Sequence, residues 1–121
     1  NVWGSTGSVV PIWRAALAAG EPLKVTDPDA TRFYMTIDQA VDLVLGTLDD
    51  MRGGELVIPD LPAYRLGDLF EAIGGFQERG FSLTGLPAFE KLHESMDETR
   101  CSKDARRMTV DELREALNGA V

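Results

Sequence analysis

TRFYMTIDQAV, residues 31–41, is the stretch that decides the fold. Aromatic strand formers fill its first half, so we predict a short strand over residues 32–35. Thr36 and Gln39 have the spacing of a capping box, in which each side chain bonds a backbone N–H of the other residue at a helix start. The sequence therefore predicts a strand that leads directly into a helix.

The predicted helix has apolar residues at helical spacing. Such a stripe is typical of a helix that faces a core. A Gly53-Gly54 pair then ends the helix. The residues expected on the core-facing side are Ala40, Val41, Val44, Leu45 and Leu48.

Further helices and strands alternate on both sides of this stretch. A second capping box, Thr109 to Glu112, opens the C-terminal helix, which we assign to the segment 102–119. Alternating helices and short strands predict an α/β or α+β fold in a single domain over residues 1–121. The other predicted helices cover 9–19, 64–73 and 90–96, and the other predicted strands cover 23–26, 55–59 and 81–84.

Composition and net charge argue against two classes of binding partner, nucleic acids and membranes. The net charge is −8, and phosphate binding in nucleic acids requires a basic patch, so we expect no nucleic acid partner. No apolar run reaches membrane-spanning length, so we expect no membrane partner either. Cys101 is the only cysteine, which excludes an internal disulfide and is compatible with a cytoplasmic location.

Catalytic and metal-binding motifs are weak in this sequence. Gly4-Ser-Thr-Gly7 precedes a helix and suggests an anion site, but a plain turn is the simpler interpretation, because no third glycine follows at the spacing of a dinucleotide fingerprint. A catalytic tyrosine can be activated by a lysine four residues on, which lowers its pKa. Each of the two tyrosines is followed at that spacing by an aspartate instead. His93 lies between Glu90 and Glu94, which fits a salt-bridged surface better than a metal site. We therefore predict no catalytic and no metal-binding residue.

Several stretches, taken together and in order, resemble one family. The most specific are TRFYMT at 31–36, GGELVIP at 53–59 and EKLHE at 90–94, supported by NVWGSTGSVVP at the start. They are similar to the C-terminal part of the UDP-N-acetylglucosamine 4,6-dehydratases, which belong to the polysaccharide-biosynthesis group of extended short-chain dehydrogenases. The resemblance covers nearly the whole chain.

This resemblance implies a substrate-binding lobe without its catalytic half. In such enzymes a preceding Rossmann domain holds NAD or NADP and the catalytic Tyr-x-x-x-Lys, so no cofactor is expected in this chain. Residues 1–7 would be the crossover from that domain, and the chain would begin inside a larger protein. The lobe would bind a UDP-sugar and be inactive alone. An exposed Rossmann-docking face could also support a homo-oligomer.

Three residues match motif positions that lie near the substrate in this family, so the resemblance makes them substrate-binding candidates. Arg32 matches an arginine expected near the diphosphate, and the alternative is a surface arginine paired with Asp27 or Asp29. Asn1 matches an asparagine beside the substrate. Glu90 matches a glutamate placed to accept hydrogen bonds from ribose hydroxyls, and the alternative is a carboxylate at a helix N-terminus.

Two departures from the family pattern weaken the expectation of tight UDP-sugar binding. The family commonly has arginines where this chain has Thr6 and Pro87. A charge-assisted hydrogen bond to phosphate contributes about 1.5–3 kcal/mol. The loop over 85–89 is expected to follow a different path as well. His93 is expected to pack or to form a hydrogen bond within the lobe.

Two other readings of the sequence remain open. The chain could be a stand-alone, non-catalytic module that binds a ligand or a protein, with Trp3, Trp13 and Phe89 as candidates for an exposed apolar patch. Ordinary core positions are the alternative for these aromatic residues. A weaker hypothesis is an acidic helical adaptor without a ligand, which the strand-like ELVIP segment disfavours. A Rossmann-encoding sequence upstream of Asn1 would favour the enzyme lobe over both.

Overall fold

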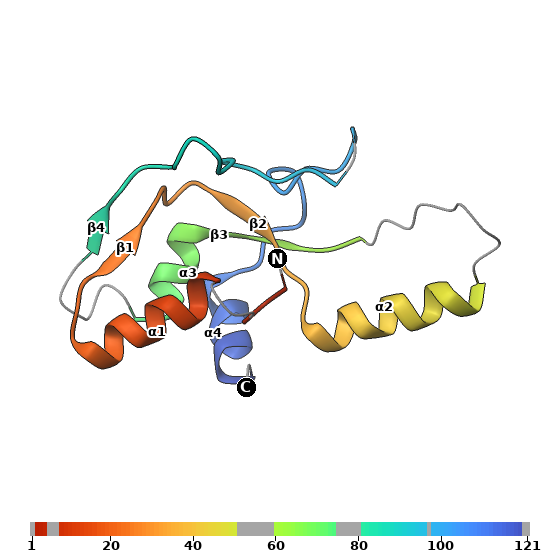
Figure 1. The fold of residues 1–121 in the computed structure, drawn as a ribbon, viewed down its shortest axis with the longest axis horizontal. Helices are drawn as coiled ribbons and strands as arrows, with labels where there is room; N and C mark the ends of the chain where they lie inside the picture. The colour runs from red at the N-terminus through yellow and green to blue at the C-terminus, as the bar shows by residue number, and fades with distance from the viewer. Residues whose placement is uncertain (1, 5–7, 51–59, 75–80, 97, 120–121) are drawn as a thin grey trace.

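The structure is a computed structural model that describes residues 2–4, 8–50, 60–74, 81–96 and 98–119. Asn1, the Gly53-Gly54 pair and the predicted strand 55–59 lie outside these residues. Within the described ranges the chain forms a mixed α/β fold of four helices and four short strands (Figure 1). The elements are α1 Val9–Ala19, β1 Leu23–Val25, β2 Thr31–Phe33, α2 Ile37–Asp50, β3 Ala63–Arg65, α3 Leu66–Ala72, β4 Phe81–Leu83 and α4 Val110–Gly119.

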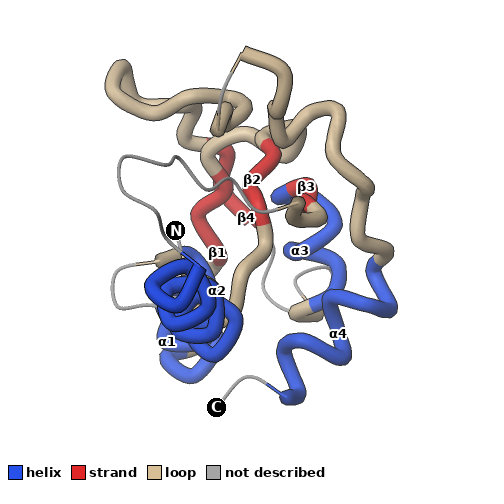
Figure 2. The backbone as a smooth tube through the Cα atoms, turned by 90° about the vertical axis from the view of Figure 1, so that its right-hand side faces the viewer, coloured by secondary structure: helices blue, strands red, loops and turns tan. Residues whose placement is uncertain are grey.

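The strands form two small sheets of two strands each. β1 pairs in parallel with β4, and Lys24 lies opposite Ser82. β2 pairs antiparallel with β3, and Arg32 lies opposite Tyr64. In Figure 2 the strands lie between α1 on one side and the α3–α4 pair on the other. This arrangement places α1, β1 and β2 beside one another.

One apolar core joins the first helix to the last. Trp13 of α1 is 1% exposed, and its ring meets Phe70 of α3 edge to face, with centroids 5.9 Å apart. Its indole N–H donates to the carbonyl of Lys24 at 3.0 Å. Arg14 donates to the carbonyl of Leu117 in α4. The buried apolar residues are Val10, Trp13, Leu23, Val25, Ala30, Ala63, Tyr64, Leu66, Leu69, Phe70, Met108, Leu113 and Leu117.

The predicted helix ends are confirmed where local side chains determine them. Thr36 and Gln39 exchange both bonds of the first capping box, at 3.0 and 3.1 Å. Thr109 and Glu112 do the same at 3.2 and 3.1 Å. α1 ends at Gly20, whose φ of 70° is a conformation that glycine adopts without strain. α4 begins at Val110, directly after Thr109 of its capping box, so residues 102–109 of the predicted helical segment lie outside the helix.

The prediction that the apolar side of α2 faces the core is wrong. Val41, Val44 and Leu45 are 47%, 58% and 57% exposed, and Ile37 is 61% exposed. Figure 1 shows why, because α2 extends away from the other helices and no other described element packs extensively along it. The side chain of Leu48 lies outside the described part. Periodicity indicates that a helix has an apolar face, but it does not supply a partner for that face.

The predicted helix over 90–96 is also wrong, because its backbone groups bond elsewhere. The carbonyl of Leu92 accepts from the N–H of Thr31, and the carbonyl of Glu94 accepts from the N–H of Ser102. The N–H of Met96 donates to the carbonyl of Arg100. Bonds to Thr31, Arg100 and Ser102 therefore replace the ladder of a helix, in which each N–H bonds the carbonyl four residues before it.

The predicted helix 64–73 begins later than expected, at Leu66. Tyr64 and Arg65 extend as part of β3 instead, because they pair with β2. Leu66, Leu69 and Phe70 face the core as predicted, and Ile73 packs against it. No described helix is long and apolar enough to cross a membrane.

Candidate ligand-binding site

A cavity of about 440 Å³ opens where α1, β1 and β2 meet the segment 84–94. This volume lies in the range of small-molecule sites. Its lining combines an aromatic wall with hydroxyl and charged groups. The aromatic residues are Trp3, Trp13, Phe33 and Tyr64, the hydroxyl residues besides Tyr64 are Ser8, Thr26 and Thr84, and the charged residues are Lys24, Arg32, Glu90 and Glu94.

Arg32 joins β2 to the segment 90–94. One terminal nitrogen donates to the carbonyls of Thr31 and Leu92, at 2.7 and 3.0 Å, and the other donates to the carbonyl of Lys91 at 2.7 Å. Carboxylate oxygens of Glu90 and Glu94 lie 3.9 and 3.8 Å from its nitrogens. The guanidinium therefore serves both as a structural link and as part of the cavity wall.

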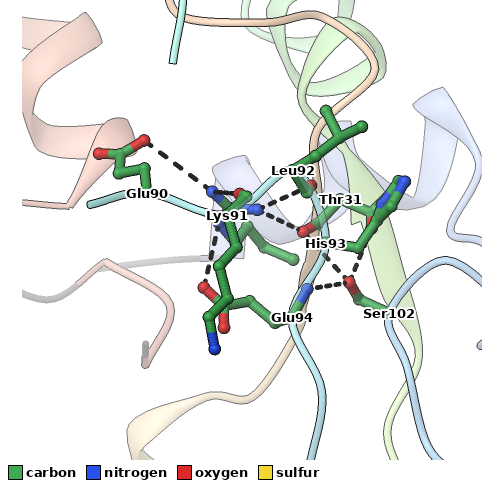
Figure 3. A network of polar contacts seen from close by, with 8 residues as sticks. Thr31, Glu90, Lys91, Leu92, His93, Glu94 and Ser102 are labelled. Atoms are coloured by element: carbon green, nitrogen blue, oxygen red, sulfur yellow. Dashed lines mark hydrogen bonds and ion pairs between the residues drawn. The ribbon is translucent and has the colours of Figure 1, made fainter. Parts of the chain in front are cut away.

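A buried hydroxyl network lies behind this wall. The Oγ1 of Thr31 is 2.6 Å from Nδ1 of His93 and 2.7 Å from Oγ of Ser102 (Figure 3). The Oγ of Ser102 also accepts from the N–H of Glu94 at 2.8 Å. Thr31 and Ser102 are 1% and 0% exposed, so these bonds satisfy groups that water does not reach. The network fixes the path of the segment that carries Glu90 and Glu94.

Tyr64 forms part of the aromatic wall and is unsuited to accept a proton. Burial raises its pKa to about 12, although the positive charge of Arg32 acts in the opposite direction. Its phenol therefore stays protonated near neutral pH. Tyr34 behaves similarly, since burial raises its pKa as well.

A second cavity, of about 410 Å³, lies between Trp3, Tyr34 and α4. Its charged lining residues are Glu112 and Glu115, so its electrostatics disfavour an anion. Trp3 lies between both cavities and contacts Tyr34 and Tyr64 edge to face. Its buried indole N–H has no hydrogen-bond partner among the described residues.

The structure brings two of the three predicted site residues together. Arg32 and Glu90 share the wall of the first cavity, whereas Asn1 lies outside the described residues. The alternative pairing of Arg32 with Asp27 or Asp29 is not found, since Asp29 instead binds Arg65 at 3.1 Å.

Burial and bonding also locate His93 and the aromatic residues proposed for an apolar patch. His93 forms a hydrogen bond within the lobe, as predicted. No group of three potential metal ligands occurs in the described part of the chain. Of the candidate patch residues, Trp13 is in the core and Phe89 is 85% exposed. Trp3 is partly buried against the core.

Four of the residues that sequence reasoning missed belong to the polar part of the site. Thr31 and Ser102 belong to the network behind the wall, and their partners lie about 60 to 70 positions away in the sequence. Lys24 and Glu94 line the cavity itself. The alternation of apolar and charged residues in Leu23-Lys24-Val25 is a local signal that could have placed Lys24 on the face opposite the core.

Sequence comparison relates the chain to enzymes of sugar-nucleotide metabolism. It is 38% identical over 97 residues to a UDP-N-acetylglucosamine 4,6-dehydratase (inverting) of Campylobacter jejuni, covering 79% of this chain and 28% of that protein. A UDP-glucose 4-epimerase of Rickettsia prowazekii is 36% identical over 98 residues, covering 79% and 29%. The capsular polysaccharide biosynthesis protein CapD of Staphylococcus aureus is 35% identical over 102 residues, covering 79% and 17%. The chain thus spans less than a third of the length of these relatives.

Structural comparison agrees with the sequence. The crystal structure of Pen from Bacillus thuringiensis superposes with a TM-score of 0.89 at 26% identity, and the match covers 99% of this chain and 47% of that one. The profile of a family described as "Polysaccharide biosynthesis protein" matches residues 1–112. The chain therefore belongs to the polysaccharide biosynthesis protein family.

Proposed function

We propose that this chain is a nucleotide-sugar-binding lobe that binds a UDP-sugar in the first cavity and does not catalyse a reaction on its own. The observation that carries the proposal is the meeting of Arg32 and Glu90 on the wall of one cavity lined by aromatic side chains. Relatives named for acting on UDP-sugars support the choice of ligand.

The chemistry of the wall fits the parts of such a ligand. Aromatic faces suit a base or a sugar ring. Arg32 lies on the wall where the family motif leads us to expect the diphosphate, and the carboxylate of Glu90, which is 40% exposed, can accept hydrogen bonds from ribose hydroxyls. We include Asn1 in the proposed site because of its place in the family motif.

The groups that the cavity presents support the proposal that the chain is not catalytic on its own. A dehydrogenase tyrosine must lose its proton readily, which an adjacent lysine favours. Tyr64 is buried with a raised pKa, and the residue four positions on is Asp68. These residues do not fit the acid–base role that NAD or NADP chemistry needs.

Titration of the 121-residue chain with UDP-N-acetylglucosamine tests binding, followed by calorimetry and by the fluorescence of the tryptophans that line the cavity. Thr84→Trp should fill the cavity and abolish binding. Ser82→Trp is the matched control, because Ser82 is exposed on the neighbouring strand and does not line the cavity. Equal affinities of the two variants would place the ligand elsewhere, and an unmodified chain that does not bind would refute the proposal.

Catalysis is tested separately, by incubating the chain with UDP-N-acetylglucosamine and either NAD⁺ or NADP⁺ and recording proton NMR spectra. We expect the sugar signals to stay unchanged. Conversion that disappears in the Thr84→Trp variant would contradict the non-catalytic part of the proposal.

A second candidate function is a protein-interaction module, and the exposed apolar side of α2 favours it. Ile37, Val44 and Leu45 are each more than half exposed on one helix. In this candidate function, two copies of the chain associate through the exposed apolar sides of their α2 helices. Sedimentation velocity of the chain and of a Val44→Glu variant tests it, since a dimer should dissociate in the variant, and a monomer in both would remove this candidate.

A further inference from the structure

We infer that Lys24 is the residue whose ammonium group binds the phosphates of the ligand. This inference rests on the proposed function and deepens it, because it assigns the anionic part of a nucleoside diphosphate to one side chain. No sequence motif and no family resemblance pointed to Lys24.

The register of β1 places Lys24 on the cavity side of the strand. Its neighbours Leu23 and Val25 are 0% and 2% exposed and belong to the core. Successive side chains of a strand point to opposite faces, so Lys24 leaves the strand on the face away from that core. Thr26, two positions on, also lines the cavity. Lys24 and Thr26 thus form one polar edge of the cavity.

Arg32 has little donor capacity left for a ligand. A guanidinium has five N–H donors, and three of those of Arg32 bond the carbonyls of Thr31, Lys91 and Leu92. The nitrogens that carry the remaining two lie 3.9 and 3.8 Å from the carboxylates of Glu90 and Glu94. Its charge is therefore offset before any ligand arrives.

Lys24 brings the net charge of the cavity lining to zero. The charged lining residues are two cations, Lys24 and Arg32, and two anions, Glu90 and Glu94. Without Lys24 the lining would be net negative and would repel a diphosphate. Lys24 is exposed and forms no ion pair with any residue in the described ranges. An ammonium on a flexible stem is a point charge that can follow phosphate oxygens.

The test measures UDP and uridine binding to the 121-residue chain and to three variants. Lys24→Ala removes the ammonium, Lys24→Arg keeps the charge, and Lys103→Ala is the matched control, because Lys103 is exposed and lies outside the cavity lining. We expect Lys24→Ala to weaken UDP binding roughly ten- to a hundred-fold, the range of a charge-assisted hydrogen bond. Uridine binding should be unchanged, Lys24→Arg should retain most of the UDP affinity, and Lys103→Ala should resemble the unmodified chain.

Each contrary result has a distinct meaning. Equal UDP affinities of Lys24→Ala and Lys103→Ala would overturn the assignment and leave the proposed function intact. Equal losses for UDP and uridine in Lys24→Ala would also overturn it, since the residue would then shape the cavity rather than meet phosphate. An unmodified chain that binds neither UDP nor UDP-N-acetylglucosamine would overturn the proposed function and this inference together.

Discussion

Helices α1 and α2 are both amphipathic, but their surroundings differ completely. Ser8, at the start of α1, makes no capping bond through its side chain, yet the helix buries Val10 and Trp13 in the core. α2 has both bonds of a capping box, yet its apolar side is exposed. The difference shows that local signals start a helix, whereas long-range packing decides whether its apolar side stabilises the fold.

The comparison is tested most strongly by the same substitution in a packed helix and in α2. Leu113 of α4 is 0% exposed, so Leu113→Ala should lower the free energy of unfolding by about 2–5 kcal/mol. Leu45 of α2 is 57% exposed, so Leu45→Ala should change it by less than about 0.5 kcal/mol. Urea denaturation of both variants measures the two effects. Similar losses would mean that α2 is packed in solution.

A second, smaller effect is expected behind the cavity wall. Thr31→Val keeps the shape of the side chain but leaves His93 and Ser102 without a shared buried partner, which should cost about 1–3 kcal/mol of unfolding free energy. Thr84→Val is the control, because the Thr84 hydroxyl is exposed and donates only a 3.4 Å bond to the carbonyl of Gly85. Denaturant unfolding compares the pair, and an unchanged midpoint for Thr31→Val would show that the network contributes nothing.

The smallest expected effect is a difference between the two capping boxes in how their contribution to stability depends on pH. The pKa of Glu112 is lowered, first by the hydrogen bond from the backbone N–H of Thr109 and then by that from Arg106. A folded pKa below the unfolded one adds stability above the ordinary glutamate pKa of about 4.3, and this stability is lost as the pH falls below it. The start of α4 should therefore weaken in acid, whereas the Gln39 box of α2 does not titrate.

Glu112→Gln tests this difference when unfolding is compared between pH 6 and pH 3. The variant should lose less stability on acidification than the unmodified chain. Glu115→Gln removes a carboxylate from the same helix without touching the capping box, so it should follow the unmodified chain. Identical acid profiles for all three proteins would remove the proposed role of Glu112.

The sequence-based predictions succeeded where the determining contacts are local. Both capping boxes, Thr36 with Gln39 and Thr109 with Glu112, and the bounds of the helix over residues 9–19 depend on contacts within a few positions, and all were predicted correctly. The predicted helix at 90–96 failed because the N–H of the distant Thr31 bonds the carbonyl of Leu92, and the N–H of Ser102 bonds that of Glu94. No window of residues around Leu92 contains that information.

The predictions of site residues also succeeded for local motifs and failed for distant contacts. The family motif pointed to Arg32 and Glu90, and the structure places them on one wall. It did not point to Thr31 or Ser102, because their bonds join positions 71 residues apart. Lys24 was missed because its neighbours suggested a short extended piece without indicating which face meets a cavity.

The hydrogen bond from Arg14 to the carbonyl of Leu117 has a consequence for how the chain is made. These two residues are 103 positions apart, and Leu113 and Leu117 complete the core that Trp13 begins. During synthesis α1 leaves the ribosome long before its packing partner in α4 exists. Trp13 can meet Phe70 of α3 earlier, but the packing of α1 is completed only when Leu117 has also been synthesised, so the last contacts of this core form late.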